Sequence, residues 1–277
     1  MVTIPEISPP LPRDFGWRRN LPNLAGLDWL RAGWADFKDQ PVLSLIYGFG
    51  VFGVSLATVY GFFRLDMDYV LLPALAGFLV VGPILGLGLY EKSRRLALGQ
   101  PVGLFSMIFA RPRAGGQVIF AGLLLCLVML LWMRAAVILY ALFFGLQPFP
   151  GLDAVTATLF TTASGWGLII VGTVVGGLFA AFSFAISVFA IPMLLNERID
   201  ALTAMGTSMA LVWNNMSVMI VWGAVVVALM TVGVVTALLG LIVIFPILGH
   251  ATWHAYKTMR GDPTAARTIQ ALDGAEA

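Results

Sequence analysis

The sequence predicts an all-α, polytopic membrane protein with six transmembrane helices. The chain has 277 residues, of which 60% are hydrophobic and only 11% are charged, whereas about 25% of residues are charged in soluble domains. The apolar residues also form uncharged runs of at least the length, about 20 residues, that a helix needs to cross a bilayer. A soluble fold is therefore excluded, and a disulfide scaffold is excluded because the chain has one cysteine.

The uncharged runs define the expected spans. Four of them hold one helix each, but the run from Met216 to Gly249 would be about 50 Å long as a single helix. Because the bilayer core is about 30 Å thick, we place a tight turn near Thr231–Gly233 and count two helices there. The expected spans are approximately residues 41–63, 69–90, 116–145, 165–195, 214–231 and 234–256.

The basic residues predict the orientation of these spans. Of the 16 Lys and Arg residues, only Arg64 lies on the side opposite to the termini, and only Arg134 lies within a span. Because basic loops stay on the cytoplasmic side, both termini are expected in the cytoplasm. The chain then divides into a cytoplasmic N-terminal segment (1–24), a membrane domain (25–258) and a tail (259–277) whose polar composition predicts disorder.

Three prolines indicate an internal repeat. Pro83, Pro192 and Pro246 occur in alternate spans and are followed by Ile-Leu-Gly, Met-Leu-Leu and Ile-Leu-Gly. A proline inside a helix removes a backbone hydrogen bond and kinks the helix. The recurrence favours a repeated unit, although the alternative is that Pro-Ile-Leu is simply common in membrane sequences.

Amphipathic segments precede the odd-numbered spans and support the repeat. Apolar residues follow helical spacing over 27–37 and 202–212, and a weaker copy covers 102–109. Asp200 is well placed to cap the second segment. The predicted architecture is therefore three parallel hairpin repeats, each preceded by a short amphipathic helix that lies at the membrane interface.

Two histidines are the first candidate functional residues. His250 and His254 are four residues apart, so their rings share one helix face, as a metal site requires. Further ligands would have to come from Glu91, Glu197 or Asp200. We favour the alternative of a polar pair at a helix end, and we predict neither a metal nor any other cofactor.

A second candidate group follows from the repeat. Glu91, Asp200 and His254 each lie eight residues after a repeat proline. At equal heights in a threefold bundle they could form a polar gate or a proton-linked cluster. They could equally mark where the helices leave the lipid, which requires no function and is the interpretation that we rank first.

Arg134 is the charge inside a span, which is a functional hypothesis by default. It lies about 18 residues after the start of its span, or roughly 27 Å along the helix. It could extend to the outer interface, pair with Asp66 or Asp68, or contact a ligand. Cys126 in the same span is expected to be a small buried hydrophobic residue.

Three segments resemble one family. Residues 83–91 (PILGLGLYE), 131–134 (LWMR) and 248–254 (LGHATWH) are similar to bacterial integral membrane proteins known as domain of unknown function twenty-one eighty-nine. The resemblance covers roughly residues 25–258 and implies a multi-pass protein of the bacterial inner membrane without an established activity. Members are sometimes labelled cytochrome c oxidase subunit I, but two histidines are too few for haem–copper chemistry.

Two hypotheses about function remain. The first is a non-enzymatic protein that scaffolds, assembles or modulates a larger membrane complex, which the label suggests is respiratory. The second is a permease or channel for a small solute or ion. The expected partners are the lipid bilayer and other membrane proteins or further copies of the chain, whereas a net charge of +2 implies no nucleic acid.

Overall fold

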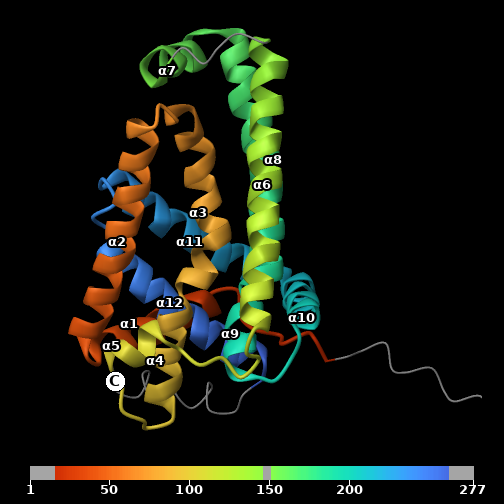
Figure 1. Ribbon diagram of the computed structural model, residues 1–277. Helices are drawn as coiled ribbons and strands as arrows, with labels where there is room; N and C mark the ends of the chain where they lie inside the picture. Colours follow the sequence, from red (N-terminus) through yellow and green to blue (C-terminus); the bar gives the residue numbers. More distant parts are fainter. Residues whose placement is uncertain (1–15, 146–150, 262–277) are drawn as a thin grey trace, which may run out of the picture.

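In the computed structural model, which describes residues 16–145 and 151–261, every regular element of the described chain is a helix (Figure 1). Four helical stretches are long and apolar enough to cross a membrane, namely Pro41–Arg64, Gln117–Phe144, Ala163–Asn196 and Met216–Val235. The helices are α1 (Ala25–Lys38), α2 (Pro41–Arg64), the 3-10 turn η1 (Asp68–Val70), α3 (Leu71–Leu85), α4 (Leu87–Ala97), α5 (Leu104–Ile108), α6 (Gln117–Phe144), α7 (Leu152–Thr161), α8 (Ala163–Ser187), α9 (Ala190–Asn196), α10 (Ala201–Asn214), α11 (Met216–Val235) and α12 (Leu241–Met259).

The other two expected spans, 69–90 and 234–256, are helical but differ from these four. The first is broken at Gly86, so that α3 has only 15 residues before α4 begins. The second corresponds to α12, a helix of 19 residues whose second half carries His250, His254 and Lys257. Helix α3 is therefore too short, and α12 too polar in its second half, to be counted among the four candidate spans.

The predicted turn near Thr231–Gly233 is wrong. Helix α11 continues to Val235, and the connection to α12 follows, with positive φ angles at Ala237 and Leu238. Gly233 lies inside the helix. A Cβ atom at this position would come within 2.7 Å of the Leu241 side chain. This glycine allows two helices to approach each other and does not form a turn.

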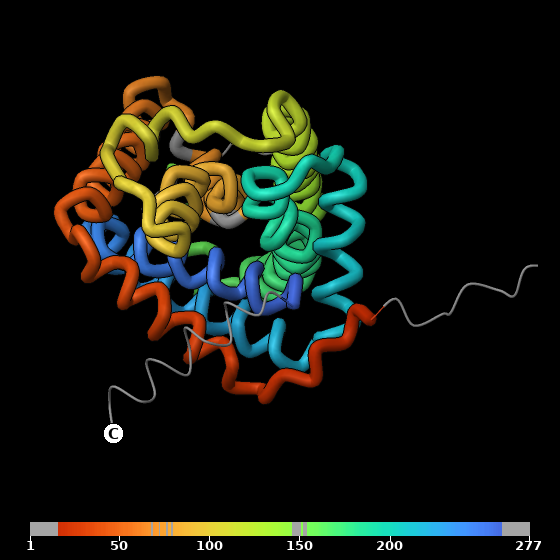
Figure 2. The backbone as a smooth tube through the Cα atoms, turned by 90° about the horizontal axis from the view of Figure 1, so that it is seen from below, coloured from red at the N-terminus to blue at the C-terminus, as the bar shows by residue number. Residues whose placement is uncertain are grey.

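The long helices form three hairpins within the described residues. They are α2 with α3–α4, α6 with α8–α9, and α11 with α12. Each is preceded by a shorter helix, and Figure 2 shows α1, the segment with α5, and α10 around the outside of the hairpins. The α6–α8 hairpin extends beyond the α2–α3 hairpin at the upper end in Figure 1, where α7 lies.

Both ends of the described chain lie at the opposite end of the bundle, which we call the basal end because it carries α1, α4, α5, α9 and α10 (Figure 1). A hydrogen bond joins the two ends of the described chain, because Arg19 Nε donates to the Met259 carbonyl at 2.7 Å. Asp200 at this end accepts a hydrogen bond from the Thr203 amide, which is the capping role that the sequence predicts.

Helix α12 packs closely against three neighbours at glycines. A Cβ atom on Gly33 of α1 would lie 2.5 Å from the Ala251 nitrogen, and one on Gly249 would lie 2.6 Å from Leu89 of α4. Gly48 of α2 lies against the Ile242 carbonyl, which is the carbonyl four residues before Pro246. Proline leaves that carbonyl without its helical donor, so this close approach lies where α12 has lost a hydrogen bond.

A side chain from a neighbouring helix fills the break between α8 and α9. The Ser208 hydroxyl of α10 donates to the Ala185 carbonyl at 2.7 Å and accepts from the Phe189 amide at 3.2 Å. In an uninterrupted helix these two groups would bond to each other. The hydroxyl therefore replaces the missing bond, three residues before Pro192.

The break between α3 and α4, just after Pro83, is bridged in a similar way. The Tyr47 hydroxyl of α2 donates to the Leu85 carbonyl at 2.8 Å, and the Gly88 amide donates to it at 3.3 Å. Helix α12, by contrast, is continuous through Pro246. Two of the three prolines thus lie beside a break that an inserted hydroxyl satisfies.

We predict that Ser208→Ala destabilises the protein by about 1–3 kcal/mol, because it leaves a carbonyl and an amide unsatisfied in an apolar surrounding. The measurement is the thermal unfolding midpoint in detergent. Ser183→Ala is the matched control, because the buried Ser183 hydroxyl only adds a bond to the Phe179 carbonyl of its own helix. Equal midpoints for the two variants would contradict the prediction.

Candidate functional site

Polar side chains from four helices meet inside the basal end, between α12 and the helices α1, α2 and α4. Ser44, Lys92 and His250 are 0% exposed and Ser93 is 1% exposed. Buried polar groups of this kind are costly unless each is hydrogen-bonded. We call the following residues the polar cluster: Asp36, Ser44, Lys92, Ser93, His250 and His254.

His250 lies in the middle of the polar cluster between two serines. Its Nε2 is 3.0 Å from the Ser44 hydroxyl, and its Nδ1 is 2.8 Å from the Ser93 hydroxyl. Lys92 donates to the Ser44 hydroxyl at 2.9 Å and to the Gln40 carbonyl at 3.1 Å. Because an ammonium group only donates, Ser44 accepts from Lys92.

The other end of the polar cluster is a carboxylate. His254 Nε2 lies 2.9 Å from Asp36 Oδ2, and the Ser93 hydroxyl also contributes to lowering the pKa of Asp36. Burial raises the pKa of Asp36, but the hydrogen bond and the charge of His254 outweigh it, so that the pKa lies below its ordinary 3.8. Hydrogen bonds thus connect Lys92, Ser44, His250 and Ser93 in series, and a separate hydrogen bond joins Asp36 to His254.

Lys92 supplies the positive charge of the polar cluster, and its burial disfavours the charged form of the amine. Burial lowers its pKa from 10.5 to about 8, although the nearby carboxylates of Asp36 and Asp39 oppose the shift. The amine therefore still carries most of its proton at neutral pH. Because the members of the polar cluster come from four helices, their hydrogen bonds hold α1, α2 and α4 against α12.

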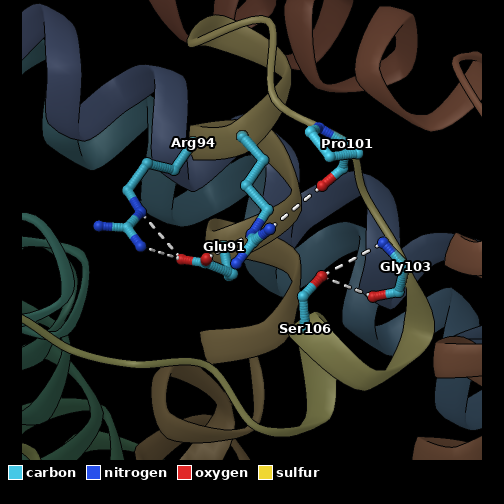
Figure 3. A network of polar contacts seen from close by, with 6 residues as sticks. Glu91, Arg94, Pro101, Gly103 and Ser106 are labelled. Atoms are coloured by element: carbon cyan, nitrogen blue, oxygen red, sulfur yellow. Dashed lines mark hydrogen bonds and ion pairs between the residues drawn. The ribbon is translucent and has the colours of Figure 1, made fainter.

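The two histidines have separate partners. Serine hydroxyls occupy both ring nitrogens of His250, and Asp36 occupies Nε2 of His254. No group of three or more His, Cys, Asp or Glu side chains in the described chain is arranged to hold a metal. Glu91 was considered as a further ligand, but it faces Arg94 in an ion pair (Figure 3). The absence of a metal or cofactor remains a prediction.

The structure does not bring Glu91, Asp200 and His254 together. Glu91 is 1% exposed and binds Arg94 at 2.6 Å and Arg95 at 2.7 Å. Asp200 is exposed and caps α10, and its hydrogen bond with Thr203 lowers its pKa. Each of the three therefore has its own local role.

Glu197, the other possible metal ligand, is also bound to protein groups. It accepts hydrogen bonds from the Tyr256 hydroxyl at 2.7 Å and from Arg260 Nε at 2.9 Å. Its second oxygen binds the other side of the same guanidinium at 2.7 Å. This bidentate pair connects the ends of α9 and α12 at the basal end.

Helix α6 presents two of the predicted residues on its outer face. Arg134 is exposed and has no ion pair within the part of the chain that the structure describes, so the expected pair with Asp66 is absent. The side chain of Asp68, the alternative partner, lies outside the described residues. Cys126 is exposed, and the prediction that it is buried is wrong, because this face of α6 points away from the other helices.

Most of the polar cluster was not predicted. Lys92 belongs to a run of charges with Glu91, Arg94 and Arg95, which resembles a solvated basic loop. Ser44 is a lone hydroxyl in an apolar run, and such residues commonly bond to their own helix. The available signals were His250 and His254, whose partners become visible only when the four helices are assembled.

We predict that Asp36→Asn destabilises the protein by about 2 kcal/mol at neutral pH, because it removes a charge-assisted hydrogen bond from a buried site. Since the pKa of Asp36 is lowered on folding, its stabilisation is complete above pH 3.8 and is lost as the pH falls through the lower folded value. Unfolding midpoints measured between pH 3 and pH 7, values chosen to bracket the ordinary carboxylate pKa of about 4, should therefore fall less steeply in the variant.

Asp28→Asn is the control for this experiment. Asp28 lies on the same helix, but its ion pair with Arg31 is 3.5 Å long and exposed, and such pairs contribute little. If both variants behave alike, Asp36 has no special part in stability.

Comparison with known proteins gives one result. The family model described as "Predicted integral membrane protein (DUF2189)" matches residues 71–196. No curated protein and no solved structure gave a significant match. The matched segment includes Lys92 and Ser93 but ends before α12, so the family does not assign a role to the whole polar cluster. Over residues 71–196, from α3 to the end of α9, the chain is thus similar to the DUF2189 family of predicted integral membrane proteins.

Proposed function

We propose that the protein is a non-enzymatic, multi-pass membrane component that scaffolds or modulates a larger membrane complex. The observation that carries this proposal is the apolar centre of the bundle, where α3, α8, α11 and α12 meet. A void of about 80 Å³ lies there, and no charged side chain lines it. Among its lining residues are Phe78, Phe184, Phe245 and Leu248.

A permease or channel would need polar groups along a water-filled path. The polar cluster lies at the basal end only, and its groups bond to one another and not toward a cavity. Its chemistry favours holding helices together over passing a solute. The permease alternative thus lacks a specific observation in its favour.

The outer face of α6 supports a role in assembly. Leu127, Leu130 and Ile138 are each more than half exposed, and Arg134 lies among them on the same helix face. A charge on a lipid-facing stripe is costly unless a headgroup or a partner meets it. We propose that Arg134 binds a carboxylate of a neighbouring membrane protein or of a second copy of the chain.

The proposal includes six spans in three parallel repeats, with both termini in the cytoplasm of a bacterium and the helices in its inner membrane. The threefold succession of a short helix and a hairpin supports the repeats. The contact between Arg19 and Met259 supports an even number of spans. In this arrangement two of the six spans are irregular. One consists of α3 and α4 and contains a helix break, and the other is α12, whose second half is polar.

Topology reporters test the six spans. Fusions after residues 100, 147 and 261 are expected to report cytoplasmic, periplasmic and cytoplasmic positions, because one expected span separates residue 100 from residue 147 and three separate residue 147 from residue 261. The fusion after residue 100 is decisive, since it tests whether α3 and α4 cross the membrane. A periplasmic signal there would overturn the arrangement.

The assembly role predicts a complex that depends on Arg134. In mild detergent the chain should elute with a partner or as an oligomer, and Arg134→Leu should reduce that species about tenfold. Arg64→Leu is the control, because Arg64 is exposed at the end of a span and outside the α6 face. A monomer that carries ions across reconstituted vesicles faster than empty vesicles do would instead support the permease.

A further inference from the structure

A second cavity lies between α2, α3, α6 and α11, extends to the first residue of α12 and is open on one side, where Val54, Val227 and Val234 of its lining are exposed. Its volume is about 490 Å³. Its walls come from the second halves of α2 and α11 and from most of α3, including Phe62, Leu75, Phe78, Val227 and Val234. None of these residues belongs to the polar cluster, so the cavity is a separate feature.

The polar side chains in the lining each use their one hydroxyl proton within their own helix. Ser55, Thr58 and Thr231 each donate to the carbonyl four residues earlier in their own helix, at 2.8, 2.9 and 2.8 Å. The remaining lining residues are apolar, and none is charged. A charged solute would find no charged partner in this lining, which disfavours its entry.

The size of the cavity calls for an occupant. An apolar cavity of about 150 Å³ already takes up small apolar ligands, and this one is roughly three times as large. Empty space of this size forfeits the dispersion contacts of all the side chains around it. An apolar molecule would restore those contacts.

The surroundings identify the kind of molecule. Two of the walls, α2 and α11, are helices long and apolar enough to cross a membrane, which puts the cavity at the depth of the lipid chains. The end of the cavity at Phe62 and Leu71 adjoins the α2–α3 connection, where Arg64 and Asp66 are exposed. This polar end suits a headgroup, and the apolar interior suits a hydrocarbon chain.

We propose that this cavity binds one acyl chain of a membrane phospholipid, with the headgroup at the α2–α3 connection. The acyl chain lies between the α2–α3 hairpin and the α11–α12 hairpin and fills the space that separates these two hairpins. The phospholipid is then a structural component that sets how these two hairpins pack. This site is independent of the assembly role proposed above, because it involves neither α6's outer face nor Arg134.

The test fills the cavity with protein side chains. Ala74 and Val227 both line it, and the double variant Ala74→Phe/Val227→Phe should exclude the lipid. Ala181→Phe is the matched control, because Ala181 is exposed on α8. Native mass spectrometry of the full chain in detergent is expected to show one phospholipid on the wild type and on the control, and at least tenfold less on the double variant.

A second measurement uses the wild type alone and does not depend on the folding of any variant. After delipidation, added dioleoylphosphatidylglycerol should raise its unfolding midpoint, whereas the same concentration of the free headgroup glycerol phosphate should not. The absence of both a retained lipid and a rise in the midpoint overturns the proposal. So does equal retention in a folded double variant, or a retained molecule that is not a phospholipid.

Discussion

The architecture depends on one constraint: a backbone group that loses its helical partner in apolar surroundings must find another. Helices α3–α4 and α8–α9 are both interrupted, and at each interruption a hydroxyl from a different helix takes the place of the missing bond. Tyr47 does so from α2 and Ser208 does so from α10. Because each hydroxyl serves a carbonyl and an amide at once, the break and the docking of the neighbouring helix stabilise each other.

The same constraint applies to side chains at the basal end. Lys92 and Asp36 carry opposite charges into a region where water is excluded, and such charges are tolerated only when they are paired or hydrogen-bonded. Here two serines and His250 bond in series to the lysine, and His254 bonds to the carboxylate. Removing one member would therefore disturb all four helices, which suits a rigid element better than a moving gate.

The outer surface has a different character. Helix α6 leaves Leu127, Leu130 and Arg134 exposed on one side, and the cavity beside α2 lies among apolar walls. Both features are incomplete within the described residues, since Arg134 has no ion pair there and the cavity lacks filling atoms. Hydrocarbon suits the cavity, whereas Arg134 requires a polar group. We therefore propose a lipid chain for the cavity and a carboxylate for Arg134.

The amino-acid sequence alone determined the membrane class, the short helices ahead of each hairpin and the Asp200 cap, because each follows from local hydrophobicity, helical spacing or a single capping side chain. The helix breaks at Gly86 and Phe189, the position of the α11–α12 turn and the exposure of Cys126 were decided by tertiary structure. So was the polar cluster, whose members are separated by up to 218 residues in the sequence. Residues such as Lys92 and Ser44 have no distinctive local pattern, because their role comes from hydrogen bonds that exist only after α1, α2 and α4 have packed on α12.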